Sequence, residues 1–187
     1  MDSKKVSVIA VFAALTVVLN MSPIKIPAPF APFLFYQIWE IPIVTTTLLF
    51  GFGTGILVSI INTIVLLVVF PGALPTGPIY NLIAVLSTIL GIYATQEVIN
   101  RRYKLRGNAV TIISTTTGII ARVVAMTLVN WTFLPFPPPI GFSMPQAVIA
   151  PLIPLIGFFN ATLALYTIPI GYVLAMTVRT KFYYSND

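Results

Sequence analysis

The sequence predicts an all-α integral membrane protein, a single domain over residues 1–187 built as a bundle of six transmembrane helices. Three observations predict this: the composition, the spacing of apolar segments and the placement of basic residues. Hydrophobic residues make up 58% of the chain and charged residues only 7%, whereas soluble domains carry roughly 25% charged residues. So little charge cannot cover a water-facing surface on a chain of this length.

Six apolar segments alternate with connections rich in proline and glycine. A membrane-spanning helix needs about 20 apolar residues at about 1.5 Å per residue, and the second segment is short by this measure. In the last segment, Pro151 and Pro154 suggest a short broken helix before about Gly157. The expected spans are residues 6–21, 38–50, 56–70, 79–98 and 109–133, and a last one that ends near residue 178.

The basic residues indicate the orientation of the chain. They gather on one side of a six-span arrangement, in Lys4 and Lys5, in the run at 101–106, and in Arg179 and Lys181; the connections on the opposite side hold only Lys25. Cytoplasmic loops carry the excess of Lys and Arg. We therefore expect a multi-pass protein of the plasma membrane with both termini cytoplasmic. Because the positive charge sits at segment ends, the net charge of +6 indicates no nucleic-acid partner.

A polar face is predicted within the fifth span. Arg122, Met126 and Asn130 are each four residues apart, so they lie on one side of a helix. A charge near the bilayer centre is costly and normally faces a protein interior or a water-filled cavity. Two interpretations of Arg122 are open. It is a structural residue that pairs with a neighbouring helix or caps carbonyls, or this face of the helix lines a polar pocket. In the expected orientation Arg122 lies about 12 Å deeper in the membrane than Asn130.

With this orientation, four spans contribute polar and aromatic side chains to the outer half of the membrane. Singly, each has a simpler explanation: a lone Asn bonds a neighbouring helix for about 1 kcal/mol, Tyr and Trp form an interfacial belt, and Glu40 lies exposed at the headgroup level. Their convergence instead favours a pocket for a planar, weakly charged ligand with polar edges. The candidate residues are Tyr36, Gln37, Glu40, Tyr80, Asn81, Arg122, Met126, Asn130, Trp131 and Asn160.

Catalytic and energy-coupling motifs are missing from the sequence. Cysteine and histidine are absent, which removes the commonest metal ligands and general base. There is no phosphate-binding loop and no nucleophile–base arrangement. Glu40 and Glu97 both fall near span ends, so no buried acid for a proton cycle is expected. We therefore expect a non-enzymatic binding subunit of a larger machine, without metal or cofactor.

The first span carries a small-residue surface formed by Ala10, Ala13 and Ala14. Ala10 and Ala14 have the spacing that lets two helices approach closely. Ordinary packing inside the bundle explains this equally well, whereas an exposed face would indicate a membrane partner.

The chain resembles the substrate-binding S components of energy-coupling-factor (ECF) vitamin transporters, most closely the riboflavin-specific branch. The likeness covers nearly the whole chain. It is carried by AVFAA at residues 10–14, FLFYQIWEIP at 33–42, RVVAMTLVN at 122–130 and FN at 159–160.

This resemblance implies an outward-facing riboflavin pocket, in which Asn130 and Asn160 contact the ligand; it also points to Tyr36 and Glu40. It implies that the alanine surface docks on a transmembrane coupling subunit, which works with two ATPase subunits. One position differs, because Leu163 stands where the riboflavin branch commonly has Lys. An S component for another vitamin or a nucleobase-like compound, a stand-alone facilitator and a purely structural scaffold remain alternatives.

Overall fold

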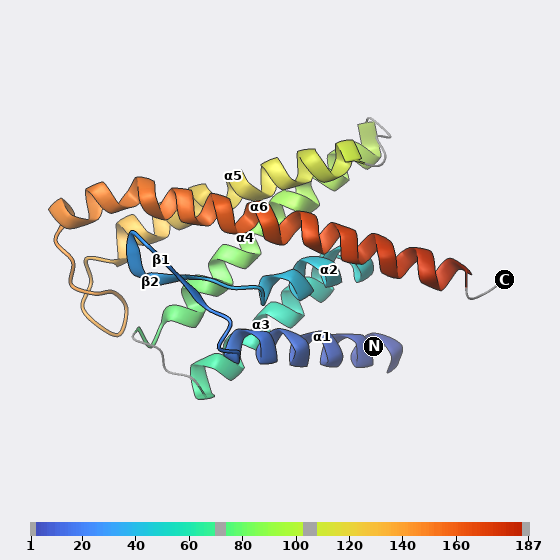
Figure 1. Ribbon diagram of the computed structural model, residues 1–187, viewed down its shortest axis with the longest axis horizontal. Coiled ribbons are helices and arrows are strands. Elements are labelled where there is room, and N and C mark those ends of the chain that lie inside the picture. The colour runs from blue at the N-terminus through green and yellow to red at the C-terminus, as the bar shows by residue number, and fades with distance from the viewer. Residues whose placement is uncertain (1–2, 70–73, 103–107, 185–187) are drawn as a thin grey trace.

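A computed structural model describes residues 3–69, 74–102 and 108–184 of the chain. It contains six helices and one short antiparallel hairpin among these residues (Figure 1). In chain order the elements are α1 (Ser3–Met21), β1 (Ile26–Ala28), β2 (Ala31–Tyr36), α2 (Glu40–Phe50), α3 (Phe52–Val69), α4 (Gly77–Arg102), α5 (Asn108–Phe133) and α6 (Gln146–Tyr184).

The predicted helical bundle is confirmed, but an all-α description is incomplete because the first connection forms a β-hairpin. Ile26 pairs with Tyr36 and Pro27 with Phe35, and the register shifts after Pro27. Proline excludes a helix here, yet it is tolerated in an edge strand whose N–H faces away from the partner strand. The exclusion of a helix was predicted from the sequence, whereas the pairing of the two strands was not.

The break expected in the last span is wrong. α6 runs unbroken for 39 residues and contains Pro151, Pro154 and Pro169. Each proline removes one backbone donor, but membrane helices tolerate this where neighbouring groups satisfy the freed carbonyls. The two early prolines therefore do not end the helix.

Four helices of the described chain are long and apolar enough to cross a membrane: α3, α4, α5 and α6. The apolar parts of the other two helices, Val6–Met21 of α1 and Glu40–Phe50 of α2, are shorter. α2 has only 11 residues, about 16 Å of helix. Its first nine residues are all buried, so it lies mostly inside the bundle.

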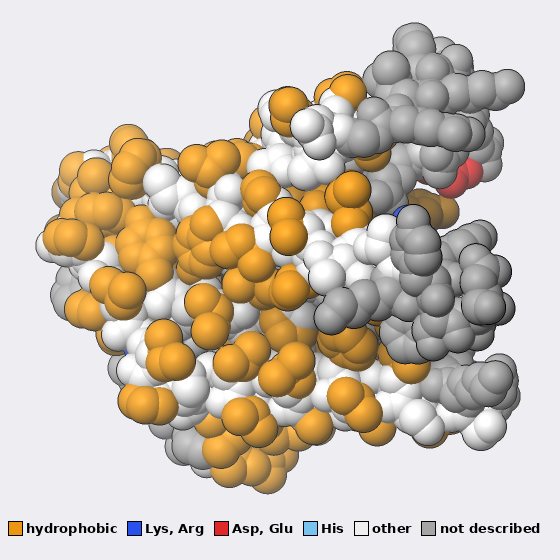
Figure 2. All heavy atoms as spheres, turned by 45° about the vertical axis from the view of Figure 1, so that its right-hand side comes forward, with side chains coloured by type: hydrophobic (Ala, Val, Ile, Leu, Met, Phe, Trp, Pro, Cys, Tyr) orange, Lys and Arg blue, Asp and Glu red, His pale blue; other side chains and the backbone are white. Residues whose placement is uncertain are grey.

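α1 begins and α6 ends at the same end of the bundle, whereas the connection from α5 to α6 lies at the opposite end, with the hairpin turned towards it (Figure 1). Arg179 belongs to the first of these ends, while Lys104 and Arg106 lie outside the described residues. The assignment of that end to the cytoplasm stays a prediction. Figure 2 shows a face covered largely by hydrophobic side chains, as a lipid-facing surface requires.

Close contact between α4 and α5 depends on small residues. A Cβ added to Gly91 would lie 2.7 Å from the Thr117 carbonyl oxygen and 3.0 Å from the Gly118 Cα. Thr95 and Thr117 share a hydrogen bond of 2.5 Å between their hydroxyls. Such residues let two membrane helices approach closely, which brings the polar residues of α4 and α5 together.

Candidate functional site

A buried ion pair lies at the centre of the bundle, between α2 and α5. Arg122 Nη1 lies 2.6 Å from Glu40 Oε2, and Nη2 lies 2.9 Å from Glu40 Oε1. The side chains are only 3% and 4% exposed, respectively. Bidentate geometry is the strongest arrangement available to these two groups, and the carboxylate also sits in the first turn of α2, where the helix dipole favours negative charge.

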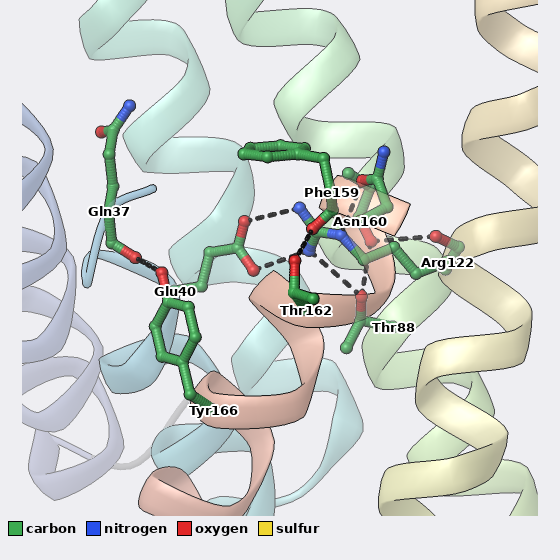
Figure 3. A network of polar contacts seen from close by, with 10 residues as sticks. Gln37, Glu40, Thr88, Arg122, Phe159, Asn160, Thr162 and Tyr166 are labelled. Carbon is green, nitrogen blue, oxygen red and sulfur yellow. Dashed lines mark hydrogen bonds and ion pairs between the residues drawn. The ribbon is translucent and has the colours of Figure 1, made fainter. Parts of the chain in front are cut away.

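Arg122 joins two further helices to this pair (Figure 3). Its Nε donates to Asn160 Oδ1 of α6 at 2.9 Å, and Nη1 makes a longer contact of 3.4 Å with Thr88 Oγ1 of α4. The guanidinium is therefore paired with neighbouring helices, which was one of the two interpretations of Arg122; the other was a face that lines a polar pocket. Four helices meet at this one side chain.

Met126 and Asn130 lie on the same buried face of α5 as Arg122, as their spacing predicts. Asn130 Nδ2 donates to the Met126 carbonyl oxygen at 2.7 Å. Asn160 Nδ2 does the same on α6, donating to the Ile156 carbonyl oxygen at 2.9 Å. Each amide is thus anchored by its own helix, one turn back.

The end of the hairpin is fastened to α6 beside the ion pair. The Tyr36 hydroxyl lies 2.9 Å from Thr162 Oγ1, and the Tyr36 ring lies 4.8 Å from the Phe159 ring, centroid to centroid. One turn further along α6, the Tyr166 hydroxyl donates to the Gln37 carbonyl oxygen at 2.6 Å. Gln37 Oε1 is buried without a hydrogen-bond partner. The hairpin therefore covers the polar centre from one side.

Glu40 lies deeper than the sequence suggested. Its expected position near the outer surface is wrong, because the hairpin carries the chain into the bundle and α2 begins at the level of Arg122. The expectation that no acid is buried fails for the same reason. The signal that could have found this arrangement is the shortness of the second apolar segment, which leaves no length for α2 to start at the surface.

Three other candidate residues stay outside the network. The Tyr80 hydroxyl donates to the Ile140 carbonyl oxygen at 2.9 Å and so holds the start of α4 against the connection from α5 to α6. Asn81 is half-buried in the same turn. Trp131 is 45% exposed, which suits an interfacial aromatic better than a buried contact. In the other direction, sequence reasoning missed Thr88 and Tyr166, which are ordinary polar residues in apolar segments.

The alanine surface of α1 divides into two parts. Ala13 is 3% exposed and belongs to the same core cluster as Val58 of α3. Ala10 and Ala14 are exposed. The pair with the close-approach spacing therefore faces outwards.

A cavity of about 570 Å³ lies elsewhere, between α4 and α5 on the side towards the end of α4. Its lining is almost wholly apolar and carries no charged residue; it consists of Gly91, Ala94, Thr95, Val98, Ile99, Ile113 and Thr117. None of the predicted site residues belongs to it.

No known protein-family model matches the chain, and no curated protein matches it. Among solved structures, it is similar to the S component of a bacterial ECF transporter, with a TM-score of 0.68 and 21% sequence identity over 100% of both chains. The likeness is one of fold, and it extends over the whole bundle. This protein thus has the fold of an ECF-transporter S component.

Proposed function

We propose that this protein is the substrate-binding S component of an ECF-type importer and that its substrate is riboflavin. The observation that carries the proposal is the polar centre of the bundle: Asn130, Asn160 and the Arg122–Glu40 pair lie buried among apolar helices, beneath a hairpin that carries Tyr36. Buried polar groups in a membrane protein are expensive and usually functional. The shared fold supports the same role.

Riboflavin would bind where the hairpin now contacts α6. The hairpin residues Leu34 and Tyr36 pack against apolar residues of α6 there, so entry of a ligand requires the hairpin to separate from α6. Aromatic rings from β2 and α6 would stack on the flat ring of the vitamin, and the two amides would bond its polar edge. The protein itself catalyses no reaction in this proposal.

Transport would depend on partners. We assign Ala10 and Ala14 to the contact with a transmembrane coupling subunit, because both are exposed on α1 and small residues allow close helix approach. Two ATPase subunits would drive release of the vitamin to the cytoplasm.

Leu163 favours a second candidate within the same class. This residue is buried and packs against Ala28 and Phe159, so an apolar side chain occupies a position where the riboflavin branch commonly supplies an amine. Another flat vitamin or a nucleobase-like compound that has fewer hydrogen-bond acceptors would fit beside the Leu163 side chain equally well.

The test is to purify the protein from a host fed with riboflavin. A yellow preparation that shows flavin fluorescence, with riboflavin identified by mass spectrometry, supports the proposal. Colourless protein that fails to quench flavin fluorescence at micromolar riboflavin excludes this ligand, and a mass spectrum of any other co-purified molecule then identifies the substrate. Vesicles that contain this chain alone should show no riboflavin flux; flux without ATP would indicate a facilitator.

A further inference from the structure

We infer that Arg122 fixes the orientation of the Asn160 amide, so that Asn160 presents its free N–H to a bound molecule. This inference rests on the proposed function, in which Asn160 contacts the substrate. A guanidinium has five N–H donors and no acceptor. Because Arg122 Nε lies 2.9 Å from the Asn160 side chain, the group that faces it must be the amide oxygen; the reverse orientation would set donors against donors.

A second neighbour selects the same orientation. Asn160 Nδ2 lies 2.9 Å from the Ile156 carbonyl oxygen, which only accepts. One N–H of the amide is engaged there, and the second makes no hydrogen bond with the residues that the structure describes. The amide oxygen is held by Arg122, so the group of Asn160 that has no protein partner is an N–H.

Arg122 is too firmly held to contact the ligand itself. Three of its N–H groups are directed at Glu40 and Asn160, and a longer contact reaches Thr88. Turning towards a ligand would break a buried bidentate ion pair, which is strongly unfavourable. Arg122 is therefore a positioning residue, although the sequence pattern placed it among the ligand contacts.

The two amides then have different roles in recognition. Asn130 Nδ2 donates to the Met126 carbonyl oxygen, and Asn130 Oδ1 makes no hydrogen bond with any described residue, so Asn130 can accept from a ligand. Asn160, whose oxygen is already bonded to Arg122, offers its free N–H instead. We therefore expect the substrate to present an acceptor, a carbonyl or a ring nitrogen, to Asn160, and a compound with only an amine at that position to bind more weakly, because two donors would meet.

A binding cycle tests whether Arg122 acts through Asn160. Riboflavin affinity is measured by fluorescence quenching for the wild type, Asn160→Ala, the pair variant Glu40→Gln/Arg122→Met, and the triple variant. The pair variant removes both charges together, so no unpaired charge is left buried. We expect Asn160→Ala and the pair variant each to weaken binding about tenfold, and the triple variant to be no weaker than Asn160→Ala. Two effects that multiply in the triple variant would overturn the inference.

A conservative variant and a ligand-free measurement complete the test. Arg122→Lys keeps a donor-only cation but loses the bidentate bonds to Glu40, so riboflavin binding should be weakened less than in the pair variant; a loss as large as that of the pair variant contradicts the inference. In protein labelled with ¹⁵N-arginine, the Arg122 Nε–H signal, assigned by its loss in Arg122→Lys, should shift and exchange faster in Asn160→Ala.

An unchanged Nε–H signal in Asn160→Ala would show that Arg122 does not hold the amide. Suppose instead that the Nε–H signal changes in Asn160→Ala but the wild type binds no riboflavin. Riboflavin would then be rejected as the substrate, while the orientation of Asn160 would stand. The two failures are therefore distinguishable.

Discussion

Arg122 and Glu40 form the buried ion pair at the centre of the bundle, and each charge can stay buried only because the other compensates it. Helical spacing placed Arg122 on a buried face with Met126 and Asn130, because a period of 3.6 residues is a local property of the chain. Its partner Glu40 lies 82 positions away. Pairing over such a distance depends on where α2 begins, which the hairpin determines and no local pattern records.

The ion pair leads to a first prediction, on stability. Glu40→Ala should destabilise the fold by about 3–5 kcal/mol, because it leaves a buried guanidinium without its counter-charge. The pair variant Glu40→Gln/Arg122→Met should cost clearly less, since no charge then remains at the centre. Thermal unfolding in detergent measures both. Thr116→Ala is the control, because Thr116 is exposed and bonds only to its own helix.

An Arg122 that merely filled space would give a different ranking. In that case the double substitution would be the more damaging, because it alters two buried side chains instead of one.

Among the elements, the hairpin and α6 show where proline was informative and where it misled. The prolines of residues 22–37 correctly excluded a helix. Those of α6 did not, because a long apolar helix packed against α2 and α5 compensates for the lost backbone bonds. Helix existence followed from apolar length, whereas strand pairing and helix continuity depended on tertiary contacts.

The hairpin's attachment to α6 gives the second prediction. Tyr36→Phe removes the hydroxyl that bonds Thr162 but keeps the ring against Phe159. With one hydrogen bond fewer holding the hairpin on α6, riboflavin should bind several-fold faster, because the hairpin must leave α6 before the ligand enters and a net hydrogen bond contributes about 1 kcal/mol. Stopped-flow quenching of flavin fluorescence measures this association rate. Tyr93→Phe is the matched control, because the Tyr93 ring is exposed and stacks on Phe52 of α3 instead of on the hairpin. Equal acceleration of binding in both variants would show that the hairpin does not control the entry of riboflavin.

The contact between α4 and α5 gives the third prediction. Gly91→Val should destabilise the bundle by about 1–3 kcal/mol, because a side chain there meets the backbone of Thr117 and Gly118. Gly53→Val is the control at the start of α3, where an added Cβ meets nothing within 4 Å. Both variants replace a helical glycine by valine, so a clearly lower melting temperature for Gly91→Val reports the contact between α4 and α5. Equal melting temperatures would show that the helices can separate without cost.

At the scale of the whole molecule, the fourth prediction concerns the exposed part of α1. Ala10→Leu/Ala14→Leu should abolish co-purification with a coupling subunit and leave riboflavin binding unchanged, because both positions point away from the bundle. Ala13→Leu should instead lower the melting temperature, since Ala13 is buried in the core cluster that also contains Val58. The spacing of these alanines is visible in the sequence, whereas only the fold separates the outward pair from the inward residue. Intact co-purification of the double variant would place the docking surface elsewhere.

The fifth prediction concerns topology. α1 begins and α6 ends at one end of the bundle (Figure 1), and the positive-inside rule assigns that end to the cytoplasm. Green fluorescent protein fused at either terminus should therefore fluoresce, and alkaline phosphatase fused there should be inactive. Active phosphatase at either terminus would reverse the predicted orientation.

The length of α6 has a consequence for the surrounding lipid. The apolar part of α6, Gln146–Thr180, is 35 residues long, about 52 Å of helix, whereas the hydrocarbon layer of a bilayer is about 30 Å thick. Such a segment must tilt steeply, thicken the bilayer around it, or extend beyond the hydrocarbon layer into water. Each response costs a fraction of a kcal/mol per ångström of mismatch. Bilayer thickness therefore acts, together with packing against α2 and α5, on the tilt of the helix that carries Asn160, so lipids of different acyl-chain length become a means of adjusting how this protein rests in the membrane.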